Sequence, residues 1–224
     1  MSDDYNQSPF GGDDDEFAIN SESRCACLLI LDKSGSMRGQ PIRELNEGMK
    51  TLREELLEDS LAAKRAEIGV LSFGPVTEER GFATVDRFDP PQLKAEGTTP
   101  MGEAIERGIA LINQRKQRYR DNGIGYYRPW IFLITDGAPT DKWSNARDLV
   151  HQGESDGAFA FFPIGVQEAR MDILEQISVR QPRKLNELQF RELFQWLSAS
   201  LRQVSHSRVG DKVELPTPTG WEAV

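Results

Sequence analysis

Two apolar runs that each lead into an aspartate constrain the fold of this chain most strongly. Residues 25–31 run directly into Asp32, and residues 130–134 are followed by Thr135 and Asp136. Strands that are apolar on both faces are typical of parallel sheets covered by helices on each side. The carboxyl ends of parallel strands lie along one edge of such a sheet, where ligands gather. We therefore expect both aspartates to lie at this edge.

Amphipathic helical patterns alternate with the apolar runs. Apolar residues recur at three- and four-residue spacing, which predicts long helices at about 40–58, 101–120 and 190–204. The same reasoning predicts further strands near 66–73 and 158–164, weaker strands near 81–88 and 183–186, and helices at 143–154 and 170–178. The alternation predicts a Rossmann-like, doubly wound α/β fold, with a mainly parallel central sheet and helices on both faces.

Charge and composition divide the chain into three parts. Residues 1–16 hold six acidic residues and no Lys or Arg, which leaves 30 acidic against 27 basic residues, a balance of −3, out of the total of −9. We expect residues 1–20 to be an acidic leader without stable structure, residues 21–206 to form one α/β domain, and residues 207–224 to be a polar, proline-containing tail. The sequence contains no cluster of Lys and Arg of the kind that forms a nucleic-acid-binding surface.

Three loops offer oxygen ligands. The run Asp32-Lys33-Ser34-Gly35-Ser36 places a carboxylate and two hydroxyls at alternate positions, and Gly35 permits a sharp turn. Read alone, this run is equally typical of an ordinary polar turn. Gly97-Thr98-Thr99-Pro100 precedes a predicted helix, and the third loop begins at Asp136. Neutral hydroxyls together with few carboxylates suit a hard divalent cation such as Mg²⁺.

Together the three loops resemble the metal-ion-dependent adhesion site of von Willebrand factor A domains. That family reads Asp-x-Ser-x-Ser, then a Thr in a Gly-Thr loop, then Asp in a strand-terminal Thr-Asp-Gly. The resemblance implies a metal site formed by Asp32, Ser34, Ser36, Thr99 and Asp136. Thr99 is preferred because it precedes Pro100, and Thr98 remains the alternative. Mg²⁺ is the expected ion, with Ca²⁺ and Mn²⁺ as alternatives.

Coordination chemistry indicates what such a site would do. Two carboxylates do no more than neutralise the charge of a divalent ion, and the neutral hydroxyls add no negative charge. An electrophilic coordination position therefore stays open. The natural occupant is an Asp or Glu carboxylate of a protein partner, as the family resemblance also implies. Arg38, just beyond the first loop, is either a second anion contact or a solvated arginine at the start of a helix.

The motifs resemble more narrowly the bacterial TerY-type proteins of tellurium-resistance and stress loci. The resemblance covers about residues 20–224 and rests on residues 32–42, 97–104, 135–141 and 194–198. It implies a bacterial interaction module that works with kinase- or phosphatase-like partners. Some relatives carry a Cys-rich zinc extension, and this sequence has none.

A metal-dependent hydrolase or phosphatase-like enzyme that uses Asp32, Ser34 and Ser36 is the alternative function. It is disfavoured because the Gly-x-Ser-x-Gly elbow and a Gly-Lys-Ser/Thr phosphate loop are both missing. Neither His151 nor His206 has a placement that suggests a partner for a nucleophilic serine. We therefore predict that the chain is not an enzyme.

The expected cellular compartment follows from the absence of a membrane span and of a secretory signal. No apolar run approaches the ~20 residues of a membrane span, and the first residues are acidic rather than basic and then apolar. We expect a cytoplasmic protein whose Cys25 and Cys27, on one face of a strand, are reduced and pack in the core.

The acidic leader has two interpretations. Asp13–Glu16 either keep the chain soluble or occupy the open metal position, in the same chain or in a neighbouring copy through self-association. A tether raises the effective concentration of such a segment.

Overall fold

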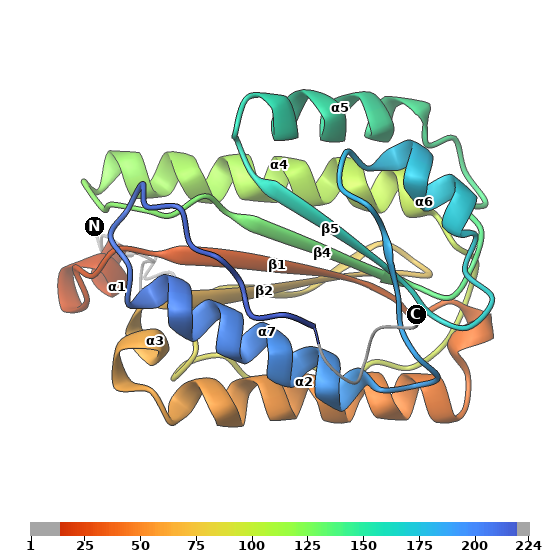
Figure 1. The fold of residues 1–224 in the computed structure, drawn as a ribbon, viewed down its shortest axis with the longest axis horizontal. Helices are drawn as coiled ribbons and strands as arrows, with labels where there is room; N and C mark the ends of the chain where they lie inside the picture. The colour runs from red at the N-terminus through yellow and green to blue at the C-terminus, as the bar shows by residue number, and fades with distance from the viewer. Residues whose placement is uncertain (1–13, 219–224) are drawn as a thin grey trace, which may run out of the picture.

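A six-stranded sheet forms the centre of the molecule in the computed structural model, which describes residues 14–218 (Figure 1). The strand order is β3-β2-β1-β4-β5-β6. The strands are β1 (Cys25–Asp32), β2 (Ala66–Phe73), β3 (Thr77–Thr84), β4 (Trp130–Thr135), β5 (Ala160–Gly165) and β6 (Arg183–Lys184). Only β3, at one edge of this described sheet, runs antiparallel to its neighbour. The predicted α/β class with a mainly parallel sheet is confirmed.

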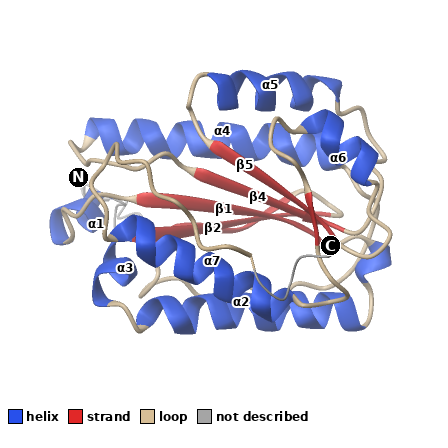
Figure 2. Cartoon of the chain, viewed as in Figure 1, coloured by secondary structure: helices blue, strands red, loops and turns tan. Residues whose placement is uncertain are grey.

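Helices cover both faces of the sheet (Figure 2). One face carries α2 (Gln40–Leu57), α3 (Ser60–Arg65) and α7 (Phe190–Ser205), and the other carries α4 (Met101–Asp121), α5 (Ser144–Ser155) and α6 (Met171–Ile177). Alternate residues of β1 enter the two cores: Cys25 and Cys27 face α2 and α7, whereas Ala26 and Leu28 face α4. The central strand is therefore buried on both sides, as its sequence predicts.

The edge strand differs from its prediction. β3 begins at Thr77, four residues before the expected start at 81, and Val85 and Phe88 follow it as buried residues of the next turn. A half-exposed edge strand carries little hydrophobic signal, so its position is set by the hairpin that joins it to β2 rather than by its apolar residues. The β2–β3 pairing also contains register shifts between Ile68 and Leu71.

A short helix occupies part of the predicted leader. α1 (Asp14–Ile19) lies where β1 begins, with Phe17 buried among arginine side chains. The expectation that residues 1–20 lack stable structure is therefore wrong for residues 14–19. Asp13 lies outside the described residues. A six-residue helix is too short to be stable alone, and its tertiary contacts stabilise it.

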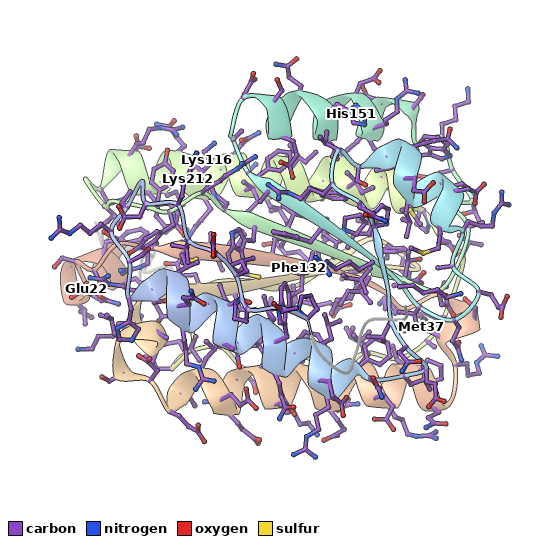
Figure 3. All side chains as sticks on the ribbon, in the orientation of Figure 1. Glu22, Met37, Lys116, Phe132, His151 and Lys212 are labelled. Atoms are coloured by element: carbon purple, nitrogen blue, oxygen red, sulfur yellow. The ribbon has the colours of Figure 1, made fainter. Side chains whose placement is uncertain are left out.

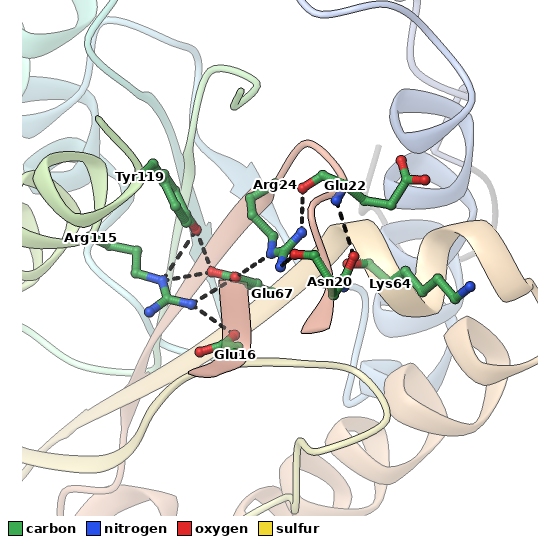
Figure 4. Close-up of polar contacts among 8 residues, drawn as sticks. All are labelled: Glu16, Asn20, Glu22, Arg24, Lys64, Glu67, Arg115 and Tyr119. Atoms are coloured by element: carbon green, nitrogen blue, oxygen red, sulfur yellow. Dashed lines mark hydrogen bonds and ion pairs between the residues drawn. The ribbon is translucent and has the colours of Figure 1, made fainter. Parts of the chain in front are cut away.

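A buried ionic cluster lies beneath α1 (Figure 4). The Glu67 carboxylate accepts hydrogen bonds from Arg24 at 2.9 Å, from Arg115 at 2.7 and 2.8 Å, and from the Tyr119 hydroxyl. Glu16 of α1 pairs with Arg115 at 3.1 Å. The cluster thereby ties α1, β1, β2 and α4 together at the end of the sheet where the strands begin.

The first part of the C-terminal tail lies on the domain. Val213 and Leu215 pack against the core on the α2 and α7 face, and the Trp196 indole donates a 2.7 Å hydrogen bond to the Pro216 carbonyl. Trp221 lies outside the described residues. Within residues 14–218, no helix is both long and apolar enough to cross a membrane.

Candidate metal site

Asp32 and Asp136 lie at the carboxyl edge of the sheet, as the sequence predicts. Asp32 is the last residue of β1, and Asp136 directly follows β4, which pairs with β1. Figure 3 shows the two ends of the molecule: Met37, just beyond the Ser36 loop, lies at this edge, and Glu22 lies at the opposite end. The strands thus bring together two aspartates that are far apart in the sequence.

The loop around Asp32 fixes its buried carboxylate. One oxygen, Oδ1, accepts a 2.7 Å hydrogen bond from the Ser34 amide, and Oδ2 accepts a 2.6 Å hydrogen bond from the Thr135 hydroxyl. Asp32 is fully buried. Both contacts hold the side chain in one orientation, so the site is largely preorganised.

Ser34, Ser36 and Asp136 form a continuous chain of oxygens. The two serine hydroxyls are 2.9 Å apart, and the Ser36 hydroxyl donates to Asp136 Oδ1 at 2.7 Å. Ser34 is buried, whereas Ser36 is exposed. The chain of oxygens therefore runs from the interior to the surface.

The structure brings Thr99, rather than Thr98, close to Asp32. A Cβ atom built on Gly137 would lie 3.4 Å from Thr99 Oγ1 and 3.9 Å from Asp32 Oδ2, so both oxygens border the same space beside Gly137. Thr99 is buried and Thr98 is exposed. All five predicted residues thus belong to three loops that meet at one edge.

Two residues that the sequence analysis missed hold the Thr99 loop in place. The Thr99 amide donates to the Thr140 hydroxyl at 3.1 Å, and the Thr140 amide donates to the Thr99 carbonyl at 2.9 Å. Asp141 accepts from the Gly102 and Glu103 amides at 3.1 and 2.8 Å, and so caps the first turn of α4. The sequence gives no specific signal for either residue, because Thr and Asp after Pro139 are typical of an ordinary turn and their partners here lie in the distant Thr99 loop and the start of α4.

Burial raises the pKa of both aspartates. For Asp32 the hydrogen bonds from Ser34 and Thr135 oppose this shift, and the nearby charge of Asp136 adds to it. For Asp136 the hydrogen bond from Ser36 opposes the effect of burial. Two partly desolvated carboxylates that repel each other are stabilised by a cation between them.

The donor set fits a hard divalent cation. Carboxylates and hydroxyls are the oxygens that Mg²⁺ accepts, and they leave room for water or a partner ligand. Across residues 14–218, no three His, Cys, Asp or Glu side chains come together to hold a metal. A zinc site rich in Cys or His is therefore not present in the described part of the chain.

The histidines lie away from the serine loop. His206, which follows α7, contacts Asp59 at 2.7 Å, and His151 is exposed on α5 (Figure 3). The hydrogen bonds of the Ser34 and Ser36 hydroxyls run to each other and to Asp136. The arrangement resembles a ligand set more than an activated nucleophile, which needs an adjacent base.

Glu16 is far from the metal site. It pairs with Arg115 near the start of β1, and the eight residues of β1 span about 26 Å. The hypothesis that the leader fills the open metal position in its own chain is therefore wrong for Glu16. Asp13 lies outside the described residues.

Comparison with known proteins shows the family to which this chain belongs. The family model for the von Willebrand factor type A domain matches residues 28–193. The curated protein sll0103 of Synechocystis, described as uncharacterized, is 29% identical over 185 residues. That match covers 76% of this chain and 41% of the relative, so the chain spans about two fifths of the relative's length.

Solved structures share the fold at low sequence identity. The pilus adhesin SpaC from Lactobacillus rhamnosus GG is 12% identical, with a TM-score of 0.66, and the match covers 83% of this chain and 31% of SpaC. Proximal thread matrix protein 1 from the mussel byssus is 17% identical, with a TM-score of 0.56 and coverages of 81% and 49%. The ArnB paralog VWA2 from Sulfolobus acidocaldarius is 17% identical, with a TM-score of 0.52 and coverages of 80% and 46%.

Proposed function

Because this chain belongs to the von Willebrand factor type A family, we propose that it is a protein-interaction module that binds Mg²⁺ and captures an acidic residue of a partner. The observation that carries the proposal is the oxygen chain from buried Ser34 through exposed Ser36 to Asp136. Asp32, Ser34, Ser36, Thr99 and Asp136 would hold the ion, directly or through water. When bound, the ion supplies an electrophilic position toward solvent.

The protein's own residues give the site its specificity for an anion. Hydroxyls do not neutralise the ion, and the two aspartates balance its charge at most, so the open position favours a carboxylate over a neutral group. Ser36 lies at the surface end of the oxygen chain, where a partner can approach. The same geometry supports a docking role rather than a catalytic one.

The finer assignment rests on motif resemblance. The similarity to TerY-type proteins supports a cytoplasmic role in tellurium resistance or another stress response, with a kinase- or phosphatase-like partner. Capture of such a partner from the native host in Mg²⁺, and its release in EDTA, would support this assignment. Capture that EDTA does not change would argue against it.

Metal titration tests the site itself. Free Mn²⁺ gives a paramagnetic resonance signal, so its loss on binding measures affinity directly. Asp32→Asn and Asp136→Ala should each weaken Mn²⁺ binding more than tenfold, while circular dichroism shows an intact fold. Asp86→Ala is the matched control, because Asp86 is exposed and follows β3 at the opposite end of the sheet. Wild-type affinity in both site variants would refute the assignment.

A further inference from the structure

Lys33 lies between two predicted metal ligands in the sequence, yet its side chain is mostly buried. Only 9% of the side chain is exposed, and its ammonium group makes two ion pairs. Lysine is seldom buried unless it is paired. A charged group in such a place needs an explanation that the metal ligands themselves do not give.

The ammonium group of Lys33 connects the site to the edge strand. It lies 3.1 Å from Glu79 on β3, whose side chain is 21% exposed, and 3.5 Å from Glu96, which is 62% exposed. Glu79 also accepts a 2.7 Å hydrogen bond from the Ser72 hydroxyl on β2. Solvent screens the Glu96 pair more strongly, so Glu79 is the main anchor.

The backbone around Lys33 connects the site to the Thr99 loop. The Lys33 carbonyl accepts a 2.7 Å hydrogen bond from the Glu96 amide, and the Gly35 amide donates to the Gly97 carbonyl at 3.1 Å. The Lys33 amide donates to the Phe73 carbonyl at 2.9 Å. The backbone of residues 33–35 is therefore hydrogen-bonded both to the end of β2, at Phe73, and to residues 96–97 before Thr99. The ion pairs of the Lys33 ammonium group hold this backbone segment in place.

The backbone segments around Ser34, Gly74 and Gly97 cross with very little space between them. Gly97 has a φ of +72°, and a Cβ atom there would lie 2.5 Å from the Gly74 carbonyl oxygen. A Cβ atom on Gly74 would lie 2.9 Å from the Ser34 amide nitrogen. A shift of any one segment must therefore move the others, including Thr99, two residues beyond Gly97.

We propose that Lys33 is the positioning residue of the metal site: its pairing with Glu79 fixes the serine loop, and through the backbone contacts of that loop with Glu96 and Gly97 it also holds the Thr99 loop in place. The inference rests on the proposed function, because it assigns to Lys33 a role in metal affinity. Lys33 itself is not a ligand, since an ammonium group has no lone pair to offer.

Electrostatics alone predicts the opposite effect. A positive charge near a cation site weakens cation binding, so removing it should tighten the site. Positioning predicts that removal weakens the site, because Thr99 is no longer held. The sign of the change in affinity therefore distinguishes the two roles.

The test is Mn²⁺ titration of Lys33→Met, Glu79→Gln and the double variant. We expect each single variant to weaken Mn²⁺ binding about tenfold, within the range for residues that orient ligands. The double variant should be no weaker than Lys33→Met, because both changes break one connection. Lys50→Met is the matched control, because Lys50 pairs with Glu47 on the exposed side of α2.

Two further variants make the outcomes distinguishable. Glu67→Gln should destabilise the fold at the opposite end of the sheet and leave Mn²⁺ affinity unchanged, so it separates positioning from a general loss of stability. Unchanged or tighter binding by Lys33→Met, or additive losses in the double variant, would overturn the role of Lys33. If Asp32→Asn and Asp136→Ala also bind Mn²⁺ with wild-type affinity, the proposed function itself fails.

Discussion

The Ser36 hydroxyl donates a 2.7 Å hydrogen bond to Asp136, a residue one hundred positions further along the chain. This contact joins the loop after β1 to the loop after β4 at the surface of the site. Because the single Ser36 hydroxyl proton points to Asp136, Ser36 accepts from the Ser34 hydroxyl with one lone pair, and its second lone pair remains available to coordinate a cation. The hydrogen bond from Ser36 thus orients its own hydroxyl, which is a neutral candidate ligand, and stabilises the negative charge of Asp136.

Ser36→Ala should weaken Mn²⁺ binding by roughly tenfold, or about 1.4 kcal/mol. The variant removes one hydroxyl oxygen and the hydrogen bond that this hydroxyl donates to Asp136. Unfolding in urea should change little, because Ser36 is exposed. Ser60→Ala, at the exposed start of α3, is the control. An affinity within twofold of wild type would show that Ser36 is not part of the site.

Glu67→Gln should reduce the free energy of unfolding by roughly 3–5 kcal/mol, because it leaves buried arginine charge uncompensated. The carboxylate is fully buried and contacts both Arg24 and Arg115 (Figure 4). Urea unfolding measures the loss. Glu47→Gln, in an exposed pair with Lys50, should cost less than about 1 kcal/mol. Equal effects of the two variants would contradict the importance of the buried cluster.

The sequence predicts those parts of the site that depend on local pattern. Asp32 and Asp136 are predictable because each follows a strand that is apolar on both faces, and such strands place their ends along one edge. Lys33 and Thr140 are not, because their roles arise from contacts with segments far away in the sequence. Their residue types alone fit a solvated turn equally well.

Glu67 is a sequence signal for the buried ionic cluster that the sequence analysis does not use. It is a charge within the predicted strand at 66–73, and a buried charge requires partners. The sequence does not say where those partners lie, since Arg24 and Arg115 come from other elements. α1 could not be predicted either, because its stability comes from the contacts of Phe17 with the arginines beneath it.

Cys25 and Cys27 should not react with a thiol reagent in the folded protein at pH 8. Burial, with the charge of Glu67, raises the pKa of Cys25 to about 12, and burial raises the pKa of Cys27 well above its usual value. Only about one Cys25 in ten thousand would then be thiolate, the reactive form. Absorbance with Ellman's reagent measures this. Both thiols should react in guanidinium, and rapid labelling of the native protein would contradict their placement in the core.

Asp59 should contribute stability that is lost in acid. Its carboxylate accepts from the Leu61 and Ala62 amides at 3.0 and 2.9 Å and contacts His206 at 2.7 Å. Burial by itself raises the pKa of Asp59, but the hydrogen bonds from Ala62, His206 and Leu61 together hold it below the usual value. A carboxyl with a lowered folded pKa stabilises the fold fully above its unfolded pKa of about 3.9, and loses this contribution as the pH falls through the folded pKa.

Two substitutions of Asp59 separate its charge from its role as a helix cap. Asp59→Ala removes both and should cost about 1 kcal/mol at pH 7, whereas Asp59→Asn keeps a capping oxygen and should cost less. The difference between wild type and Asp59→Asn should stay constant as the pH falls from 7 to about 4 and then shrink as the pH falls through the lowered folded pKa, because the wild-type carboxyl becomes neutral as well. Urea unfolding across this range measures both differences. A difference from Asp59→Asn that is constant with pH would show that the charge of Asp59 does not stabilise the start of α3.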